Sequence, residues 1–450
     1  MLMTRRHPSA CSMFVRLSLF LLLALWAPKA WAQIDPDLAP DCNNVTPRGN
    51  GKSDTKAIRN CLCTQRKAIL AAGQFLLNGP IVFPRRAANP DPANCSFADV
   101  TGTMLAGKGA GTVLSLKADC SAPWPSSGSP LTFEPVIDVN VAQGAILKDL
   151  TIKLDNLRQD CNLAVRGNFA VRIGRSPGST VNGLRIQGNK ATTGGANGGG
   201  IDAFNSPGME IRDNVITTLG YTLDQGTTST GSSGIRLDNS GCGTRCSNIE
   251  HNTISEVAFG IEVSNQSGGG FEGDSSGTRI FNNDITGASQ VTSCGSVGCS
   301  QGRAIKVQAF GSAPVRNLLV QDNKARNFGG KQEGGKIKIP NGSGLDLIGV
   351  QSSRFIHNTI DAFGDGGIGG TSSGAEFGLQ LRPFPGGVTQ GNTFNLNFFR
   401  SGQPAAPCAT SCTSGKCTSG CADVNFNGVP DQTGLTRASK GDNNFRNFRP

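Results

Sequence analysis

Seven short segments of alternating apolar and polar residues each carry a charged or amide side chain at the centre. These central residues are Arg172, Asp202, Arg236, Glu262, Lys306, Asp346 and Gln380. Alternate residues of a half-buried strand point to opposite sides, so each central side chain would face outward. If the segments stack in register, they form one column of acids and bases. Proton transfer, anion binding and metal binding all use such groups.

A second outward column lies two residues further along each segment. Its members are Gly174, Phe204, Asp238, Ser264, Gln308, Ile348 and Arg382. Asp202, Asp238 and Glu262 would fall on three successive strands, and neighbouring strands lie about 4.8 Å apart. Carboxylates in this arrangement could bind Ca²⁺ through oxygen. The alternating charges in the first column equally suit a structural ladder that keeps like charges off adjacent strands.

A repeated sequence pattern indicates how these segments are arranged in the fold. An apolar-x-x-Asn-x-apolar phrase recurs around Asn214, Asn252, Asn283 and Asn358, with looser copies around Asn189, Asn323 and Asn392. Each phrase comes with a short alternating segment, and no helical pattern lies between them. Such a period is typical of a coil of parallel strands stacked on copies of itself. We expect the recurring Asn residues to stack at a turn and hydrogen-bond along the coil axis.

The two ends of the repeat differ from its middle. Ser53 or Asp54 would be a good helix N-cap, and residues 55–72 carry apolar side chains at helical spacing. This amphipathic helix would cap the first coil, as a solenoid requires. Gly/Ser/Thr-rich loops precede most of the alternating segments and could wall one side of a groove. We expect a β-helix domain over residues 33–400, an N-terminal cap at about 41–84, and a Cys-rich cap or tail over 401–450.

The opening of this domain resembles a known family. Residues Gly49-Asn-Gly-Lys-Ser-Asp-Thr-Lys-Ala-Ile58 resemble the start of pectate-lyase-like proteins, and Ile81–Pro84 and Leu105–Thr112 resemble the strand and Gly-rich turn that follow. The resemblance implies an all-β fold, the right-handed parallel β-helix of the pectin lyase superfamily. In that superfamily, catalysis usually lies on the outer face of one strand column. The fold hosts lyases, hydrolases and non-catalytic proteins, so it does not define the activity.

The leading expectation is a lyase that acts on an anionic, uronate-containing polysaccharide. A lyase must neutralise the substrate carboxylate and remove a proton from the adjacent carbon, for which a base and Ca²⁺ or Arg would serve. We predict Arg236, Lys306, Glu262 and Asp238 as catalytic residues, with Arg236 or Lys306 as the base. The predicted substrate-binding residues are Arg172, Asp202, Phe204, Asp346 and Arg382.

Two alternatives stay open. One is an inverting glycoside hydrolase that uses Asp202, Asp238 and Glu262; Asp202 and Glu262 would lie about 9.6 Å apart, two strands from each other. The other is a non-catalytic glycan-binding or structural β-helix. A separate stretch, Asp423-Val-Asn425-Phe-Asn427-Gly-Val-Pro-Asp431, places oxygen side chains like the start of a Ca²⁺ loop.

The N-terminus predicts export. Arg5, Arg6 and Arg16 precede an apolar run up to Trp26, and Ala30-Trp-Ala32 fits a signal-peptidase site, so residues 1–32 read as a signal peptide. Of the 15 Cys, Cys11 lies in this signal. The remaining even number predicts disulfides, with Cys242/Cys246 and Cys294/Cys299 as local pairs. The cluster Cys408, Cys412, Cys417 and Cys421 could bind zinc, but export favours two disulfides there.

Composition limits the partners. Only 16% of the residues are charged and Gly accounts for 61 of 450, which fits many tight turns between short strands. The formal net charge is +10, part of it in the signal. No run of Lys and Arg with interleaved aromatic residues predicts nucleic-acid binding. We expect a secreted or periplasmic monomer that has no membrane partner after signal cleavage and that binds a polysaccharide.

Overall fold

The computed structural model describes residues 41–91, 95–116, 135–154, 168–188, 198–220, 233–267, 272–287, 302–310, 313–328, 331–333, 336–339, 343–361, 377–382, 389–395, 397–400, 412–413, 416–417, 424–426 and 443–446. The predicted signal peptide, the Cys294/Cys299 pair and most of the Gly/Ser/Thr-rich loops lie outside these residues. Asp423, Asn427, Asp431, Cys408 and Cys421 lie outside them as well.

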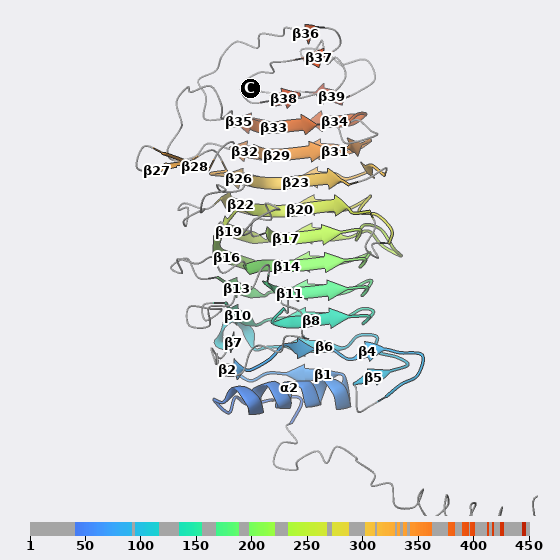
Figure 1. Cartoon of the computed structure of the whole chain (residues 1–450), viewed down its shortest axis with the longest axis vertical. Coiled ribbons are helices and arrows are strands. Elements are labelled where there is room, and N and C mark those ends of the chain that lie inside the picture. The colour runs from blue at the N-terminus through green and yellow to red at the C-terminus, as the bar shows by residue number, and fades with distance from the viewer. Residues whose placement is uncertain are drawn as a thin grey trace, which may run out of the picture. The chain divides into compact units, whose positions relative to one another are not determined.

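Three long parallel sheets form most of the chain that is described from Asp41 on, and each coil of the chain adds one strand to each sheet (Figure 1). Sheet 1 contains β1 (Lys67–Ile69), β6 (Met104–Ala106), β9 (Ile146–Lys148), β12 (Thr180–Asn182), β15 (Glu210–Arg212), β18 (Asn248–Glu250), β21 (Arg279–Phe281), β25 (Leu319–Gln321), β31 (Arg354–Ile356), β34 (Asn392–Asn395) and β39 (Asn443–Arg446). Sheet 2 contains β2 (Gly73–Leu77), β7 (Thr112–Leu116), β10 (Thr151–Lys153), β13 (Arg185–Gln187), β16 (Val215–Gly220), β19 (Thr253–Val257), β22 (Asp284–Gly287), β26 (Lys324–Arg326), β32 (Thr359–Asp361) and β35 (Phe398–Arg400).

Sheet 3 carries the predicted columns. It contains β3 (Ile81–Val82), β8 (Ile137–Asn140), β11 (Asn168–Gly174), β14 (Gly198–Phe204), β17 (Ser233–Asp238), β20 (Phe259–Asn265), β23 (Arg303–Ala309), β29 (Ser343–Ile348), β33 (Phe377–Arg382) and β38 (Val424–Phe426). The chain runs from sheet 1 to sheet 2 to sheet 3 and then starts the next coil. The fold is therefore a right-handed parallel β-helix, as the sequence predicts.

Short pairings decorate the coils. A 3₁₀ turn, η3 (Gly109–Gly111), joins β6 to β7. The two-stranded pairs are β4 (Arg85–Arg86) with β5 (Ser96–Phe97), β24 (Val315–Arg316) with β30 (Val350–Gln351), β27 (Lys331–Glu333) with β28 (Lys336–Ile339), and β36 (Cys412–Thr413) with β37 (Lys416–Cys417).

Inward side chains of like shape stack along the coils. On sheet 3, Ile201, Ile235, Ile261 and Ile305 pair in register on successive strands, and all four are fully buried. Burying one such side chain is worth about 1.5–3 kcal/mol. Every coil repeats this contact, so the core fixes the register of the outer face as well. A shift by one residue would turn each isoleucine to solvent.

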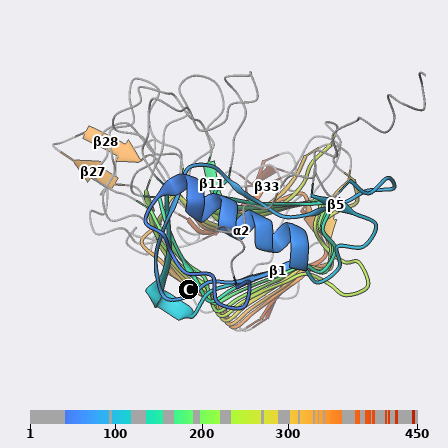
Figure 2. The same cartoon turned by 90° about the horizontal axis from the view of Figure 1, so that it is seen from below.

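The helix α2 (Gly51–Gln65) covers one end of the coils, as Figure 2 shows. Ile58 and Leu62 are fully buried, and α2 packs against β1, β2 and β3. The disulfide Cys42–Cys61 ties the helix to the segment before it. The predicted capping helix is thus confirmed.

The predicted bounds of that helix are wrong at both ends. Asn50 is the N-cap, because its side chain accepts a hydrogen bond of 2.8 Å from the Ser53 backbone N–H. The Asp54 carboxylate instead accepts bonds from the backbone N–H groups of Arg48 and Leu76. The helix ends at Gln65 because Arg66 adopts the left-handed conformation, with φ 55°.

The recurring Asn residues form a buried ladder between sheets 1 and 2. The Nδ2 of Asn214, Asn252, Asn283, Asn323 and Asn358 each donates to the Oδ1 of the next member, at 2.8–2.9 Å, and the ladder ends at Asn397. Of the looser copies, Asn392 does not belong to it, and Asn189 lies outside the described residues. Leu184 and Asn397 occupy the ladder positions that the sequence pattern assigned to Asn189 and Asn392.

Candidate functional site

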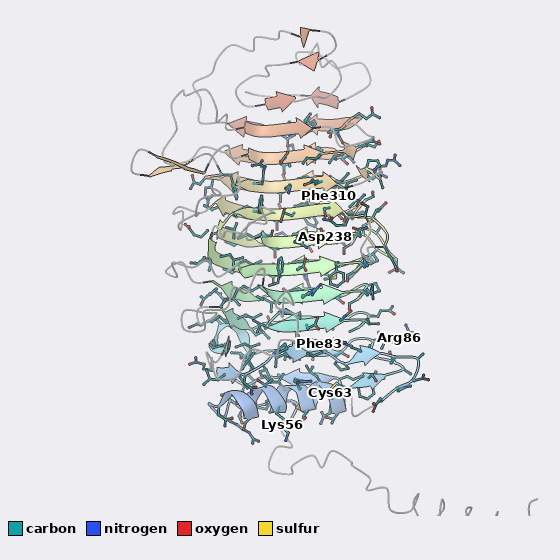
Figure 3. The ribbon with its side chains drawn as sticks, viewed as in Figure 1. Lys56, Cys63, Phe83, Arg86, Asp238 and Phe310 are labelled. Carbon is teal, nitrogen blue, oxygen red and sulfur yellow. A yellow bond between two sulfur atoms is a disulfide. The ribbon has the colours of Figure 1, made fainter. Side chains whose placement is uncertain are left out.

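Sheet 3 brings the two predicted columns together in register. The first column pairs Arg172 with Asp202, and the pairing continues in order through Arg236, Glu262, Lys306, Asp346 and Gln380. Asp138 on β8 extends this column by one strand. The second column holds Gly174, Phe204, Asp238, Ser264, Gln308, Ile348 and Arg382. Asp238 lies midway along the coils (Figure 3).

A guanidinium joins two of the carboxylates. The Nε of Arg236 lies 3.2 Å from Asp202 Oδ1 and 2.8 Å from Asp238 Oδ2. Its N–H donates to Asp238. Burial alone would lower the pKa of Arg236, but Asp202, Asp238 and Glu262 together raise it above its ordinary value. Arg236 is therefore a fixed cation.

Asp202 occupies a different electrostatic position from its neighbours. Its Oδ1 is buried and has no hydrogen-bond donor among the described residues, since the Arg236 N–H points to Asp238. Burial raises the pKa of the Asp202 carboxyl, and although Arg236 and Arg172 oppose this effect, burial outweighs them. Removing a carboxylate from water disfavours its charged form. Asp202 is thus the carboxyl in this cluster that is best suited to hold a proton.

Asp238 and Glu262 are supplied with donors instead. Asp238 accepts bonds from Arg236 and from the Ser264 hydroxyl. Glu262 accepts a bond from the Ser233 hydroxyl and lies 3.4 Å from Lys306 Nζ. The cluster therefore combines one carboxyl whose buried Oδ1 lacks a donor among the described residues with two carboxylates that are held by hydroxyl and cationic partners.

Asp346 is held by another cation. Its side chain is fully buried and lies 2.8 Å from the Nε of Arg303, which is itself buried and also donates to the Gly302 carbonyl. A buried ion pair of this kind fixes geometry. Asp346 thus lies beneath the surface of the column.

Each exposed cation of the first column lies over a phenylalanine ring. Arg172 lies 4.8 Å from the centre of the Phe204 ring, Arg236 lies 5.5 Å from Phe169, and Lys306 lies 5.3 Å from Phe259. Contacts at these distances are attractive by about 0.5–1 kcal/mol at exposed sites. Two rings lie against glycine: a Cβ at Gly199 would come within 2.1 Å of the Phe169 ring, and one at Gly174 within 2.3 Å of Phe204.

Sequence reasoning missed Phe169, Ser233, Phe259 and Arg303. They form a third outward column, in which Ser233 pairs with Phe259 and Phe259 with Arg303. If inward and outward side chains alternated strictly, the residue that follows each of these four in the sequence would face outward instead. Those neighbours are buried small residues, such as Gly234 and Ala304. The recurrence of Gly or Ala just before each alternating segment was the available signal.

Cations are more exposed than acids in the first two columns. The side chains of Arg172, Arg236 and Lys306 are 41%, 31% and 21% exposed. Those of Asp202, Asp238 and Glu262 are 7%, 1% and 16% exposed. The outer face therefore presents its positive groups to solvent and covers its carboxylates. Such a surface attracts anionic ligands.

The cluster does not fit a bound Ca²⁺. The Arg236 guanidinium already lies between Asp202 and Asp238, where a bridging ion would have to lie. Among the described residues no group of three or more His, Cys, Asp or Glu side chains could hold a metal ion. Of the second predicted calcium loop, only Asn425 falls in a described strand, β38. Calcium binding at that loop stays a prediction.

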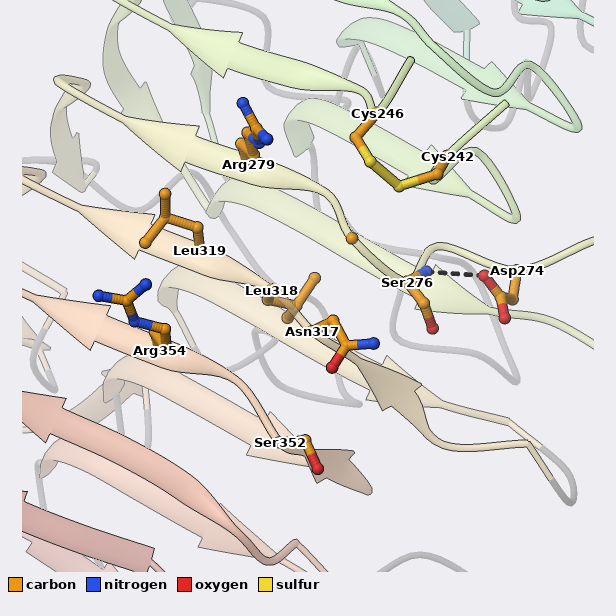
Figure 4. Close-up of a pocket in the computed structure, with 11 residues that line it drawn as sticks. Cys242, Cys246, Asp274, Ser276, Arg279, Asn317, Leu318, Leu319, Ser352 and Arg354 are labelled. Atoms are coloured by element: carbon orange, nitrogen blue, oxygen red, sulfur yellow. Dashed lines mark hydrogen bonds between the residues drawn. A yellow bond between two sulfur atoms is a disulfide. The ribbon is translucent and has the colours of Figure 1, made fainter. Parts of the chain in front are cut away.

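A hollow of about 590 Å³ lies away from this cluster, on sheet 1 and the adjoining turns (Figure 4). Its lining includes Arg279, Leu319 and Arg354, together with the Cys242–Cys246 disulfide. That disulfide was predicted and is confirmed, and a further pair joins Cys63 to Cys95. Disulfides fit a secreted protein. In the described part of the chain, no helix has the length and apolar character needed to cross a membrane.

Comparison with known proteins gives architectural likeness only. No protein-family model matches the chain, and no curated protein matches it by sequence. Among solved structures, the Dettilon tailspike protein matches 79% of this chain and 62% of its own, at 15% identity and a TM-score of 0.41. The catalytic domain of a GH87 alpha-1,3-glucanase matches 92% of this chain and 65% of its own, at 12% identity and a TM-score of 0.44.

A polygalacturonase from Erwinia carotovora ssp. carotovora matches 80% of this chain and 93% of its own, at 12% identity and a TM-score of 0.42. The chain thus spans less than two thirds of the length of the tailspike and of the glucanase. These likenesses carry no information about activity. By its strand pairing, the chain has the fold of a right-handed parallel β-helix.

Proposed function

We propose that this chain is a secreted polysaccharide-processing enzyme that hydrolyses glycosidic bonds on the outer face of sheet 3, with Asp202 as general acid. The observation that carries the proposal is the state of Asp202: burial raises its pKa, and its buried Oδ1 lacks a donor among the described residues. A general acid must hold its proton at the working pH, which enzymes arrange by burying a carboxyl.

Glu262 is the proposed base. It lies two strands from Asp202, which puts the two backbones about 9.6 Å apart, just above the carboxyl separation of about 6.5–9.5 Å that leaves room for water in an inverting hydrolase. Glu262 is also more exposed than Asp238, so water can reach it. The Ser233 hydroxyl and the Lys306 ammonium hold its carboxylate in place. Inversion at the sugar carbon is the expected outcome.

The lyase expected from the sequence receives less support. Its base was to be Arg236 or Lys306, and Arg236 is a fixed cation between carboxylates. The Nζ of Lys306 lies 3.4 Å from a carboxylate oxygen of Glu262, so this ion pair would have to open before Lys306 could act on a substrate. In the proposed hydrolase, Arg236 and Lys306 bind anionic groups of the substrate.

Product analysis tests the reaction. The purified chain is incubated with anionic polysaccharides, and both new reducing ends and unsaturated uronate absorbance are measured. Hydrolysis gives reducing ends without absorbance, and elimination gives both. We expect Asp202→Asn and Glu262→Gln each to lower the rate by 10²-fold or more, since general acid–base catalysis contributes about 10²–10⁴-fold.

Asp284→Asn is the control, because Asp284 lies on β22 of sheet 2, outside the column, and its side chain is 44% exposed. It should keep full activity. Unsaturated products would establish the lyase and overturn the hydrolase. Unchanged rates in both site variants would show that the column is a structural ladder.

A further inference from the structure

The exposed cations of sheet 3 recur on every second strand. Arg172 lies on β11, Arg236 on β17 and Lys306 on β23, with β14 and β20 between them. Two strand spacings make this repeat about 9.6 Å. The intervening strands carry Asp202 and Glu262 in the same column. The outer face therefore alternates positive and acidic positions along the coil axis.

The cations are held at these positions from below. Each lies over a phenylalanine ring, and Arg236 and Lys306 also pair with carboxylates. Because the rings and acids are less mobile than a long side chain in water, little conformational freedom remains to be lost on binding. Arg172 Nε has no hydrogen-bond partner among the described residues. The distances between these charged groups are therefore set by the protein before a ligand binds.

We propose that the ligand is an alternating polysaccharide, in which an anionic sugar and a neutral sugar take turns and lie along the coil axis. Neighbouring strands are about 4.8 Å apart, and a hexopyranose that is linked across its ring advances an extended chain by a similar length. Every second ring of the ligand then falls on a cation. This inference rests on the proposed function and specifies its substrate class.

Asp202 on β14 and Glu262 on β20 determine which kind of sugar can lie between two anionic sugars. A carboxylate on the ring that faces Glu262 would meet a like charge, which disfavours binding. A neutral ring there presents hydroxyl groups that can donate to Glu262 and Asp202. A polymer with a carboxylate on every ring would place half of its charges against acidic strands. A neutral polymer would add no anionic group to the exposed faces of these three cations, which would keep only their carboxylate partners on the protein.

Binding measurements with oligosaccharides of equal ring number test the proposal. The probes are a hyaluronan oligosaccharide, with one carboxylate in every second ring, an oligogalacturonate, with one in every ring, and a neutral glucan. Titration calorimetry uses the Asp202→Asn variant, so that no probe is consumed. We expect hyaluronan to bind most tightly. General electrostatic attraction predicts the opposite order, because the oligogalacturonate carries twice the charge.

Variants locate the binding. Arg172→Gln and Lys306→Gln should each raise the Kd for hyaluronan by about tenfold, the loss expected for one charged contact. Arg279→Gln is the control, an exposed arginine on sheet 1 that should leave the Kd unchanged. Equal or tighter binding of the oligogalacturonate would overturn the alternating ligand. So would a Kd for hyaluronan that neither variant changes.

The same set of assays separates this inference from the proposed reaction. If wild-type protein binds hyaluronan as described but releases no reducing ends, the alternating specificity stands and the hydrolase fails. If the protein hydrolyses the oligogalacturonate and binds it more tightly than hyaluronan, the hydrolase stands and the alternating specificity fails.

Discussion

Asp202 shows how the fold can prepare a residue for acid catalysis at a cost in stability. The carboxyl is buried between two arginines, yet one oxygen receives no hydrogen bond from the described residues. An unsatisfied buried polar atom costs about 1–3 kcal/mol. Strain of this kind is tolerated at functional sites and is otherwise selected against.

The first prediction concerns the stability of Asp202→Asn. Since burial raises the pKa of Asp202 in the folded protein, the folded state binds its proton more tightly than the unfolded state does. Wild-type stability therefore falls as pH rises from the unfolded pKa, near 3.8, through the folded pKa. The amide cannot ionise and escapes this loss. At neutral pH Asp202→Asn should melt at a higher temperature than wild type while it is inactive.

Thermal unfolding followed across pH checks this. The gap in Tm between Asp202→Asn and wild type should narrow as pH falls toward 3.8 and close below it, where the carboxyl is protonated in both states. The control Asp284→Asn should show no such pH-dependent gain. A lower Tm for Asp202→Asn than for wild type at neutral pH would show that the carboxylate is stabilised, and the acid role would fall with it.

The second prediction concerns the contact between Arg236 and the Phe169 ring. A methyl group at Gly199 would come within 2.1 Å of the Phe169 ring, so Gly199→Ala must displace that ring. Arg236 then loses a cation–π contact of about 0.5–1 kcal/mol. We expect a roughly two- to fivefold rise in the Kd for an anionic oligosaccharide, at about 1.4 kcal/mol per tenfold.

Gly79→Ala is the matched control, because a Cβ at Gly79 meets no atom within 4 Å. It should leave the Kd unchanged. Equal effects of the two variants on binding would show that Phe169 does not position the cation.

At the scale of elements, the Asn ladder makes each turn depend on its neighbours. Asn283 Oδ1 accepts from both the backbone N–H and the Nδ2 of Asn252. Its Nδ2 donates to the Ile249 carbonyl and to Asn323. A substitution at one turn therefore leaves donors and acceptors unsatisfied on both adjacent coils. The cost of losing a ladder Asn exceeds that of one hydrogen bond.

The third prediction follows from that arrangement. Asn283→Ala should lower the free energy of unfolding by about 3 kcal/mol, because each buried partner left unpaired costs about 1–3 kcal/mol. Denaturant titration measures the loss. Asn43→Ala, at an exposed position before the first coil, should change stability by less than about 0.5 kcal/mol. Similar losses in the two variants would contradict the ladder as a source of stability.

The sequence pattern predicts the ladder residues correctly where the repeated phrase is strict. It assigns the wrong residue where another turn of the same coil carries a similar sequence. The sequence around Asn189 matches the repeated phrase, but Ile186 in that phrase lies on β13 of sheet 2, after the turn. The residue at the turn itself is Leu184, whose backbone N–H donates to Asn214. A second ladder, made by Ser176, Ser206, Ser240 and Ser275, went unnoticed. Serine is common in surface turns, so only the three-dimensional stacking marks these four as buried.

The charged column was predictable for a different reason. Burial of Ile201, Ile235 and Ile261 fixes the register, and the period of two then fixes which residues face outward. Which of those residues is protonated, or covered by another, depends on side-chain packing across strands. Alternation alone could not tell the buried Asp202 from the more accessible Glu262.

At the scale of the domain, a coil contacts mainly the coils before and after it, so stability is close to a sum of repeat and interface terms. The end coils lack one neighbour and depend on a cap. Helix α2 supplies it at the first coil, where Ile58 and Leu62 are buried. Without that cover, apolar side chains and open strand edges become available for association.

The last prediction compares two disulfides that differ in what they close. Cys42–Cys61 closes a span of 19 residues and holds α2 over the first coil, whereas Cys242–Cys246 closes a span of 4. The chain-entropy relation gives losses of about 3 and about 2 kcal/mol for their removal. Cys42→Ala with Cys61→Ala should therefore lower Tm more than Cys242→Ala with Cys246→Ala. Release of the cap should also favour self-association, which sedimentation velocity detects as a species larger than the monomer. If the first double variant stays monomeric and both lose the same Tm, α2 is dispensable as a cap.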